Sequence, residues 1–152
     1  MGDLPTDLEG RDQSQRGYTK AVIEIDGKEI AIFNSHFSLG GVDFRNPSRE
    51  ILIEEMNEYK YAILCMDANS GYKEWQQFLD AGYVLGNGHN GEFITTTLKD
   101  DDLRNTEDRH FVGSGSIDQI LVSPTLEIKN FTSIFNSVYS DHLPITAEIA
   151  FK

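Results

Sequence analysis

An uninterrupted apolar run at residues 61–66, Tyr-Ala-Ile-Leu-Cys-Met, constrains the fold most, because the acidic residue Asp67 follows it at once. A short continuous run of this kind is typical of a strand that is buried on both faces. In open α/β sheets, ligands bind beyond the carboxyl ends of the strands, which is where Asp67 and Asn69 stand. The segment therefore predicts a layered domain of the α/β or α+β class, with a site at one edge of its sheet.

The rest of the chain predicts further strands and two helices around that strand. Asp26-Gly27 between two apolar runs is a strong hairpin signal. Pro47 suits the first position of a helix that Asn46 caps and that runs to about residue 58. Residues 1–16 are polar and turn-rich, which predicts a lead-in to one domain over residues 17–152. The predicted strands are residues 20–25, 29–34, 61–66, 93–98, 117–123, 126–135 and 145–151, and residues 73–81 are the second predicted helix.

Composition excludes some classes of protein. The 152 residues suit a single domain with a real core, and no apolar run approaches the roughly 20 residues of a membrane span. The first residues lack the pattern of a signal peptide, so a cytoplasmic location is the default expectation. Cys65 is the one cysteine, so there is no disulfide framework.

The net charge of −12 has two interpretations. It argues against a bulk electrostatic grip on nucleic acid, and the simplest interpretation is solubility. It does not exclude a phosphate substrate, since a bound cation can invert the local field.

Four polar clusters stand at the ends of predicted strands, which suggests one site assembled along the rim of a sheet. An acid beside a histidine, as in Asp141-His142, can bind a divalent cation and contact a phosphate at the same time. The clusters are Asn34-Ser35-His36, Asp67-Ala68-Asn69, Ile117-Asp118 and Ser140-Asp141-His142.

Each of these residues also has a purely structural interpretation. His36 is either a strand-end histidine or a donor to a phosphate oxygen, and Asn69 is of a type that favours turns. A carboxylate at the mouth of an apolar strand, such as Asp67, is costly to bury without a partner, and a metal ion or a catalytic role would supply one. Asp118 stands inside a strand, where aspartate is depleted, so it either orients His142 or marks a bulge or exposed edge.

The clusters, in this order, resemble the signatures of the endonuclease/exonuclease/phosphatase superfamily, which has the deoxyribonuclease-I-like fold. Those signatures read approximately N-T-H, an arginine on a helix, G-D-x-N, I-D-x-I and S-D-H. The matching segments here are Asn34-Ser35-His36, Arg49, Asp67-Ala68-Asn69, Ile117-Asp118-Gln119-Ile120 and Ser140-Asp141-His142, and the match extends from about residue 17 to the C-terminus. Met66, Ala68 and Gln119 depart from the usual residues of these motifs.

The resemblance implies hydrolysis of a phosphate ester by in-line attack of water. It implies that Mg²⁺ is the ion, with Mn²⁺ or Ca²⁺ as substitutes. The substrate expected first is nucleic acid, and a small phosphoester or a lipid headgroup stays open. By this resemblance, His36 contacts the phosphate, and Asn34 and Asn69 are further substrate-binding residues. Asp67 and Asn69 position the attacking water, and Asp141 and Asp67 bind the metal. Asp118 orients His142, which stabilises the transition state or acts as an acid–base catalyst.

Members of this superfamily have a further half before the matched region, which supplies the principal metal-binding glutamate and one of the two sheets of a layered β-sandwich with outer helices. The chain is therefore expected to be the C-terminal part of such a fold. The exposed sheet face would then drive pairing with a second copy. Two alternatives remain: a non-catalytic fragment that keeps a phosphate-binding corner, and an unrelated α/β binding module.

Overall fold

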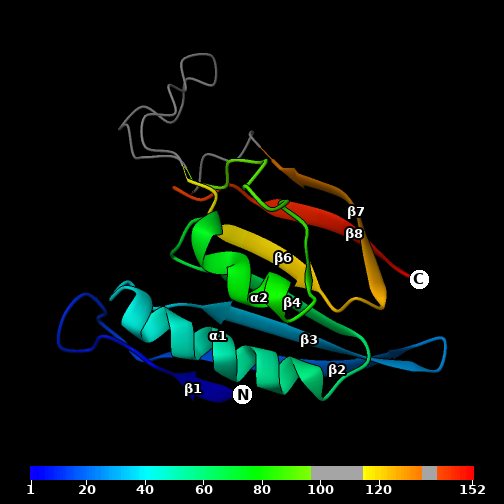
Figure 1. Cartoon of the computed structure of the whole chain (residues 1–152), viewed down its shortest axis with the longest axis horizontal. Coiled ribbons are helices and arrows are strands. Elements are labelled where there is room, and N and C mark those ends of the chain that lie inside the picture. Colours follow the sequence, from blue (N-terminus) through cyan, green and yellow to red (C-terminus); the bar gives the residue numbers. More distant parts are fainter. Residues whose placement is uncertain (97–114, 135–139) are drawn as a thin grey trace, which may run out of the picture.

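A six-stranded sheet with two helices against one face is the centre of the protein (Figure 1). The computed structural model describes residues 1–96, 115–134 and 140–152. Within these residues the strand order of the large sheet is β1-β2-β3-β4-β6-β5, and β7 and β8 form a separate two-stranded sheet. The strands are β1 (Gly2–Leu4), β2 (Arg16–Ile25), β3 (Lys28–His36), β4 (Ala62–Asp67), β5 (Val84–Leu85), β6 (Asp118–Val122), β7 (Leu126–Ser133) and β8 (Ile145–Phe151).

The hairpin of β2 and β3 forms as predicted around Asp26-Gly27. Both turn residues have positive φ, 52° and 70°, as a tight two-residue hairpin requires. β3 then pairs in parallel with β4, and β4 pairs antiparallel with β6. The carboxyl ends of β3 and β4 therefore meet the beginning of β6 at one edge of the sheet.

Helix α1 (Val42–Asn57) begins earlier than predicted, so Pro47 lies inside it and Asn46 is not its cap. The buried side chains of α1 recur at helical spacing and start before the proline, so tertiary packing holds the first turn in place. These side chains are Arg45, Ser48, Arg49, Leu52 and Met56. The second predicted helix divides into a 3₁₀ turn, η1 (Tyr72–Trp75), and the short helix α2 (Gln76–Asp80).

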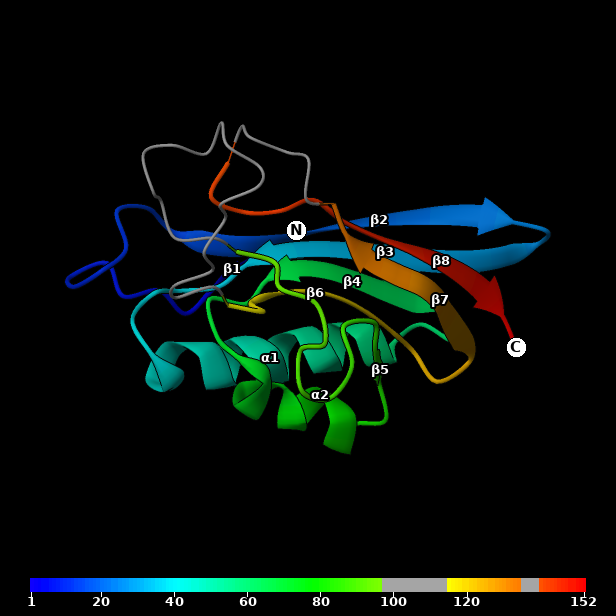
Figure 2. The same ribbon diagram turned by 90° about the horizontal axis from the view of Figure 1, so that it is seen from above.

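Alternation along the strands separates a helix-covered face from an open one. Phe33 and Leu64 are fully buried beneath α1 and α2, and Figure 2 shows both helices on the same side of the sheet. The neighbours Ile63 and Cys65 point the other way and are only half-buried. The prediction that β4 is buried on both faces was wrong, because the second face is only partly covered.

The two-stranded sheet β7–β8 covers part of the open face, over β6. An apolar groove remains between the two sheets, and Ile23 and Ile25 of β2 are 40% and 45% exposed beside it. The groove is lined by Ile23, Ile25, Ile30, Ile63, Leu126, Ile149, Ala150 and Phe151.

The predicted strand at residues 93–98 was wrong over residues 93–96, which form only an isolated bridge at Thr96, and residues 97–98 lie outside the described residues. Residues 1–16, predicted as a polar lead-in, contribute β1 to the edge of the sheet, with Leu4 in the core. Among the described residues there is no helix of the length and apolar character needed to cross a membrane.

Candidate active site

Cross-strand register brings three of the predicted site residues together in a row. His36 is paired with Asp67 across β3 and β4, and Asp67 is paired with Asp118 across β4 and β6. All three side chains belong to the open face, because they alternate with the buried residues of the same strands. The site therefore follows directly from the strand pairing, and its residues lie far apart in sequence.

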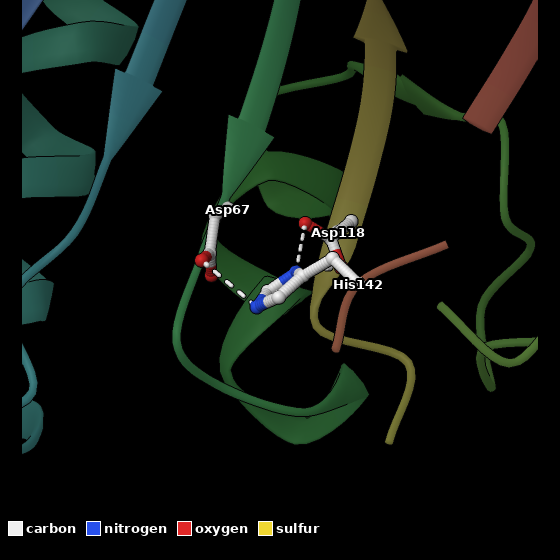
Figure 3. Close-up of side chains that lie close together, drawn as sticks. All are labelled: Asp67, Asp118 and His142. Atoms are coloured by element: carbon white, nitrogen blue, oxygen red, sulfur yellow. Dashed lines mark hydrogen bonds and ion pairs between the residues drawn. The ribbon is translucent and has the colours of Figure 1, made fainter. Parts of the chain in front are cut away.

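His142 completes the group from the segment before β8, as Figure 3 shows. Its Nδ1 lies 3.0 Å from each carboxylate oxygen of Asp118, and its Nε2 lies 3.7 Å from Oδ2 of Asp67. On the other side, Nε2 of His36 lies 3.1 Å from the same Oδ2 of Asp67. The Asp67 carboxylate thus lies between two imidazole rings, and Asp118 contacts His142 from behind.

The site is accessible from solvent but is not fully exposed. The side chains of Asp67 and Asp118 are 16% and 14% exposed, whereas those of His142 and His36 are 34% and 53% exposed. The two carboxylates are therefore largely shielded from solvent, whereas the two imidazoles are exposed enough to contact a ligand.

Burial and charge oppose each other at His142. Burial alone would lower its pKa, but the charge and hydrogen bond of Asp118, together with the charges of Asp67 and Asp141, raise the pKa above its ordinary value. Burial raises the pKa of Asp118, although hydrogen bonding from Thr95 and contact with His142 act in the other direction. With Asp118 ionised, the Nδ1–H of His142 donates to it, and Nε2 is left facing Asp67.

The other predicted residues are placed less centrally. Asn69 has a positive φ of 45°, its backbone amide donates to Oδ1 of Asp67, and its side chain donates to the Phe37 carbonyl. These contacts join the ends of β3 and β4, so Asn69 has the structural role of a turn residue whatever else it does. Asn34 and Asp141 are exposed, and neither belongs to the central group.

Asp67, Asp118 and His142 come close enough to share a metal ion, each offering one atom within 4.8 Å of the others. Carboxylate oxygens suit Mg²⁺, Mn²⁺ and Ca²⁺, and an imidazole nitrogen is tolerated by Mn²⁺. Because Asp118 is already engaged by His142, Asp67 is the carboxylate best placed to face an ion. The donor set fits one divalent cation held by few protein ligands and completed by water and substrate.

A polar network behind the site was not predicted from the sequence. Arg45 donates to Glu74 and to the carbonyl of Ser38, and Asp12 accepts hydrogen bonds from the Ser38 hydroxyl and the Leu39 amide. This network holds the loop that begins directly after His36. Glu74 and Asp12 occur in polar stretches of sequence, so no local signal distinguishes them from solvated acids.

No protein-family model matches the sequence, and a search of curated proteins found no match. Solved structures do match. A mannosyl-6-phosphatase from Bacteroides thetaiotaomicron VPI-5482 is 24% identical with a TM-score of 0.71, over 90% of this chain and 58% of that one. TDP2 from D. rerio, complexed with a single-strand DNA product, is 17% identical with a TM-score of 0.69, over 91% and 63%.

A third structure is the inositol polyphosphate 5-phosphatase domain of SPsynaptojanin, in complex with inositol (1,4)-bisphosphate and calcium ion. It is 17% identical with a TM-score of 0.64, over 98% of this chain and 55% of that one. Further matches are described as endonuclease/exonuclease/phosphatase family proteins. The chain spans little more than half the length of these structures, and over that length it has their deoxyribonuclease-I-like fold.

Proposed function

We propose that this chain carries the reaction site of a divalent-metal-dependent phosphoesterase that hydrolyses phosphodiesters by in-line attack of water. The observation that supports this most is the row His36, Asp67 and Asp118, closed by His142 at the end of the sheet. Two imidazoles and a carboxylate converge there on a volume open to solvent.

The side chains divide the work in a way that their contacts support. His142, oriented by Asp118, presents Nε2 as a hydrogen-bond donor or acid–base group to a phosphoryl oxygen. His36 presents its ring from the other side of Asp67, so that it can donate to a second oxygen of a phosphate bound beside this carboxylate. Asp67, with Asn69 beside it, is placed to accept a proton from an attacking water or to hold its orientation.

A divalent cation held by Asp67, with Asp141 and Asn69 as further oxygen donors, would neutralise phosphate charge. An ion of this kind also offsets the repulsion between an anionic substrate and a chain of net charge −12. Mg²⁺ is the ion proposed first, and Mn²⁺ or Ca²⁺ are the substitutes.

We propose nucleic acid as the substrate class, and a small phosphoester or a lipid headgroup as the alternatives to be tested. The comparison with TDP2, whose structure holds a single-strand DNA product, supports this choice. The phosphatases among the matched structures make a phosphomonoester the necessary second arm of the test.

The test measures hydrolysis of bis-p-nitrophenyl phosphate, p-nitrophenyl phosphate and plasmid DNA, with Mg²⁺ or Mn²⁺ and after EDTA. His142→Ala is expected to lower kcat/KM by about 10²–10⁴-fold, the usual contribution of a general acid–base group. His89→Ala is the matched control, because His89 is exposed on a loop outside the site. Equal activity in both variants would show that the turnover comes from elsewhere.

A folded wild-type protein that hydrolyses none of these substrates would favour the second candidate, a non-catalytic domain with a phosphate-binding corner. The observation behind this candidate is that the chain spans only 55–63% of the matched structures reported above. Binding of phosphate without turnover, measured by calorimetry, is the result expected in that case.

We also propose that two copies pair through the open sheet face at β2. Ile23 and Ile25 are exposed beside an apolar groove there, and an apolar surface of this kind promotes association. Light scattering across a concentration series is expected to show a dimer, which Ile23→Lys should dissociate. A monomer at every concentration would refute the pairing.

A further inference from the structure

We propose that Thr95 is a positioning residue that holds Asp118 and His142 in register with each other. The proposal rests on the proposed function, since it concerns the same site. Thr95 is fully buried and belongs to no strand, and its hydroxyl lies close enough to the Asp118 carboxylate to help to lower the pKa of that group. It also contacts the backbone on either side of the pair.

The hydroxyl of Thr95 fixes the start of β6. Its Oγ1 accepts hydrogen bonds from the backbone amides of Ile117 and Asp118, each at 3.0 Å. Asp118 is the first residue of β6. Its backbone amide donates to the Thr95 hydroxyl and not to a neighbouring strand. On the side of β6 that faces away from β4, this oxygen atom holds the Asp118 backbone, and the pairing with Asp67 holds it on the other side.

The backbone of the same residue fixes the segment that carries His142. The carbonyl of Thr95 accepts a hydrogen bond of 2.7 Å from the Leu143 amide, and the next residue, Thr96, forms a bridge with His142 itself. Leu143 is buried, which holds the segment against the sheet. Thr95 is thus bonded at one end to the Asp118 backbone and at the other end to the residue after His142.

This arrangement explains why a hydroxyl is needed at position 95. Valine has the same shape as threonine but cannot accept from the two amides, which would then lose their partner in a partly buried place. Serine keeps the acceptor and loses only a methyl group. If Thr95 positions the pair, Thr95→Val should disturb the site and Thr95→Ser should not. If Thr95 only fills space, serine should be the worse replacement.

The test reads the tautomer of His142 by long-range ¹H–¹⁵N NMR of the metal-free protein. At a pH high enough for the His142 ring to be neutral, the wild type is expected to hold the proton on Nδ1, facing Asp118, as one tautomer. Thr95→Val is expected to give a mixture of the two tautomers, and Thr95→Ser is expected to keep the single one. Thr146→Val on β8, where the side chain is exposed, is the matched control and should keep it too.

The kinetic arm uses the same variants. Thr95→Val is expected to lower kcat by about 10–100-fold with little change in KM, the usual effect of removing a group that orients a catalytic residue. A single tautomer in Thr95→Val would overturn the proposal. If that variant fails to fold, Thr95→Ser still decides: a mixture of tautomers in it would overturn the proposal as well.

The two arms separate this proposal from the proposed function. A wild type without activity, whose single His142 tautomer is lost in Thr95→Val and kept in Thr95→Ser, would refute the phosphoesterase and support the positioning role. An active wild type, with the same single His142 tautomer in every variant, would support the phosphoesterase and refute the positioning role.

Discussion

Replacing Glu74 with alanine is expected to lower the free energy of unfolding by about 2–4 kcal/mol, somewhat less than the cost of removing one partner from a fully buried ion pair, because the Glu74 side chain is 20% exposed. Glu74 accepts from Arg45 at 2.7 and 2.9 Å and from Arg49 at 3.0 Å. The Arg49 side chain is only 1% exposed, so its charge is poorly solvated when the carboxylate is removed.

The shifts in pKa agree with this dependence. Burial lowers the pKa of Arg49 even though Glu74 acts to raise it, so the guanidinium is held charged at a cost. Burial alone would raise the pKa of Glu74, but the hydrogen bonds and charges of Arg45 and Arg49 lower it. Loss of the Glu74 carboxylate therefore leaves two guanidinium charges, those of Arg45 and Arg49, without their anionic partner.

Urea unfolding followed by the fluorescence of Trp75, the one tryptophan, measures the effect next to the substitution. Glu54→Ala on the exposed side of α1 is the control and should change stability little. Arg49→Met, which removes the buried charge and fills the space, is expected to cost much less than Glu74→Ala. A loss below about 1 kcal/mol for Glu74→Ala would show that water reaches the two arginines.

Asp12→Asn is expected to destabilise the protein at neutral pH and to remove part of its sensitivity to acid. Burial alone would raise the pKa of Asp12, but hydrogen bonds from Ser38, Arg16 and the Leu39 amide, with the charge of Arg16, lower it from 3.8 to about 2. Because the pKa is lower in the folded state, the ionised carboxylate stabilises the fold above pH 3.8. That contribution is lost as the pH falls from 3.8 through about 2.

The expected difference at pH 7 is about 1–2 kcal/mol, less than the full shift would give, because solvent reaches the partner Arg16, whose side chain is 15% exposed, and screens the pair. Urea midpoints for wild type and variant should converge as the pH falls from 4 towards about 2, the folded-state pKa of Asp12. Asp3→Asn, at an exposed position of β1, is the control. A gap between wild type and Asp12→Asn that stays constant down to pH 2 would contradict the assignment.

The elements that were predicted correctly carry their signal locally. The hairpin follows from Asp26-Gly27, and β8 follows from the alternating pattern that begins at residue 145. The polar ends of β3, β4 and β6 could be grouped from the sequence, since strands that neighbour one another place their ends together. The order of clusters and the resemblance they carry indicated the deoxyribonuclease-I-like fold.

What could not be predicted depends on partners far apart in the chain. Glu74 and Arg45 are 29 residues apart, and Asp12 and Ser38 are 26 apart, so neither bond leaves a local pattern. The start of α1 was missed because Pro47 is a strong signal for a first helical position, and contacts of Arg45 with η1 outweigh it. Thr95 was missed for a similar reason, since its role depends on where β6 and the His142 segment meet.

The row of side chains across β3, β4 and β6 has a consequence for how the protein folds. Its members come from position 36, position 67 and position 118, with His142 added from the segment before β8, so no short piece of the chain contains two of them. We expect contacts of such long range to form late in folding, because the closure of long loops must come first. A bound ion would therefore stabilise only the state in which all of these segments are in contact. It would also suppress local unfolding that detaches the His142 segment from the sheet. Slower hydrogen exchange at Leu143 on adding Mn²⁺ would be the sign of this coupling.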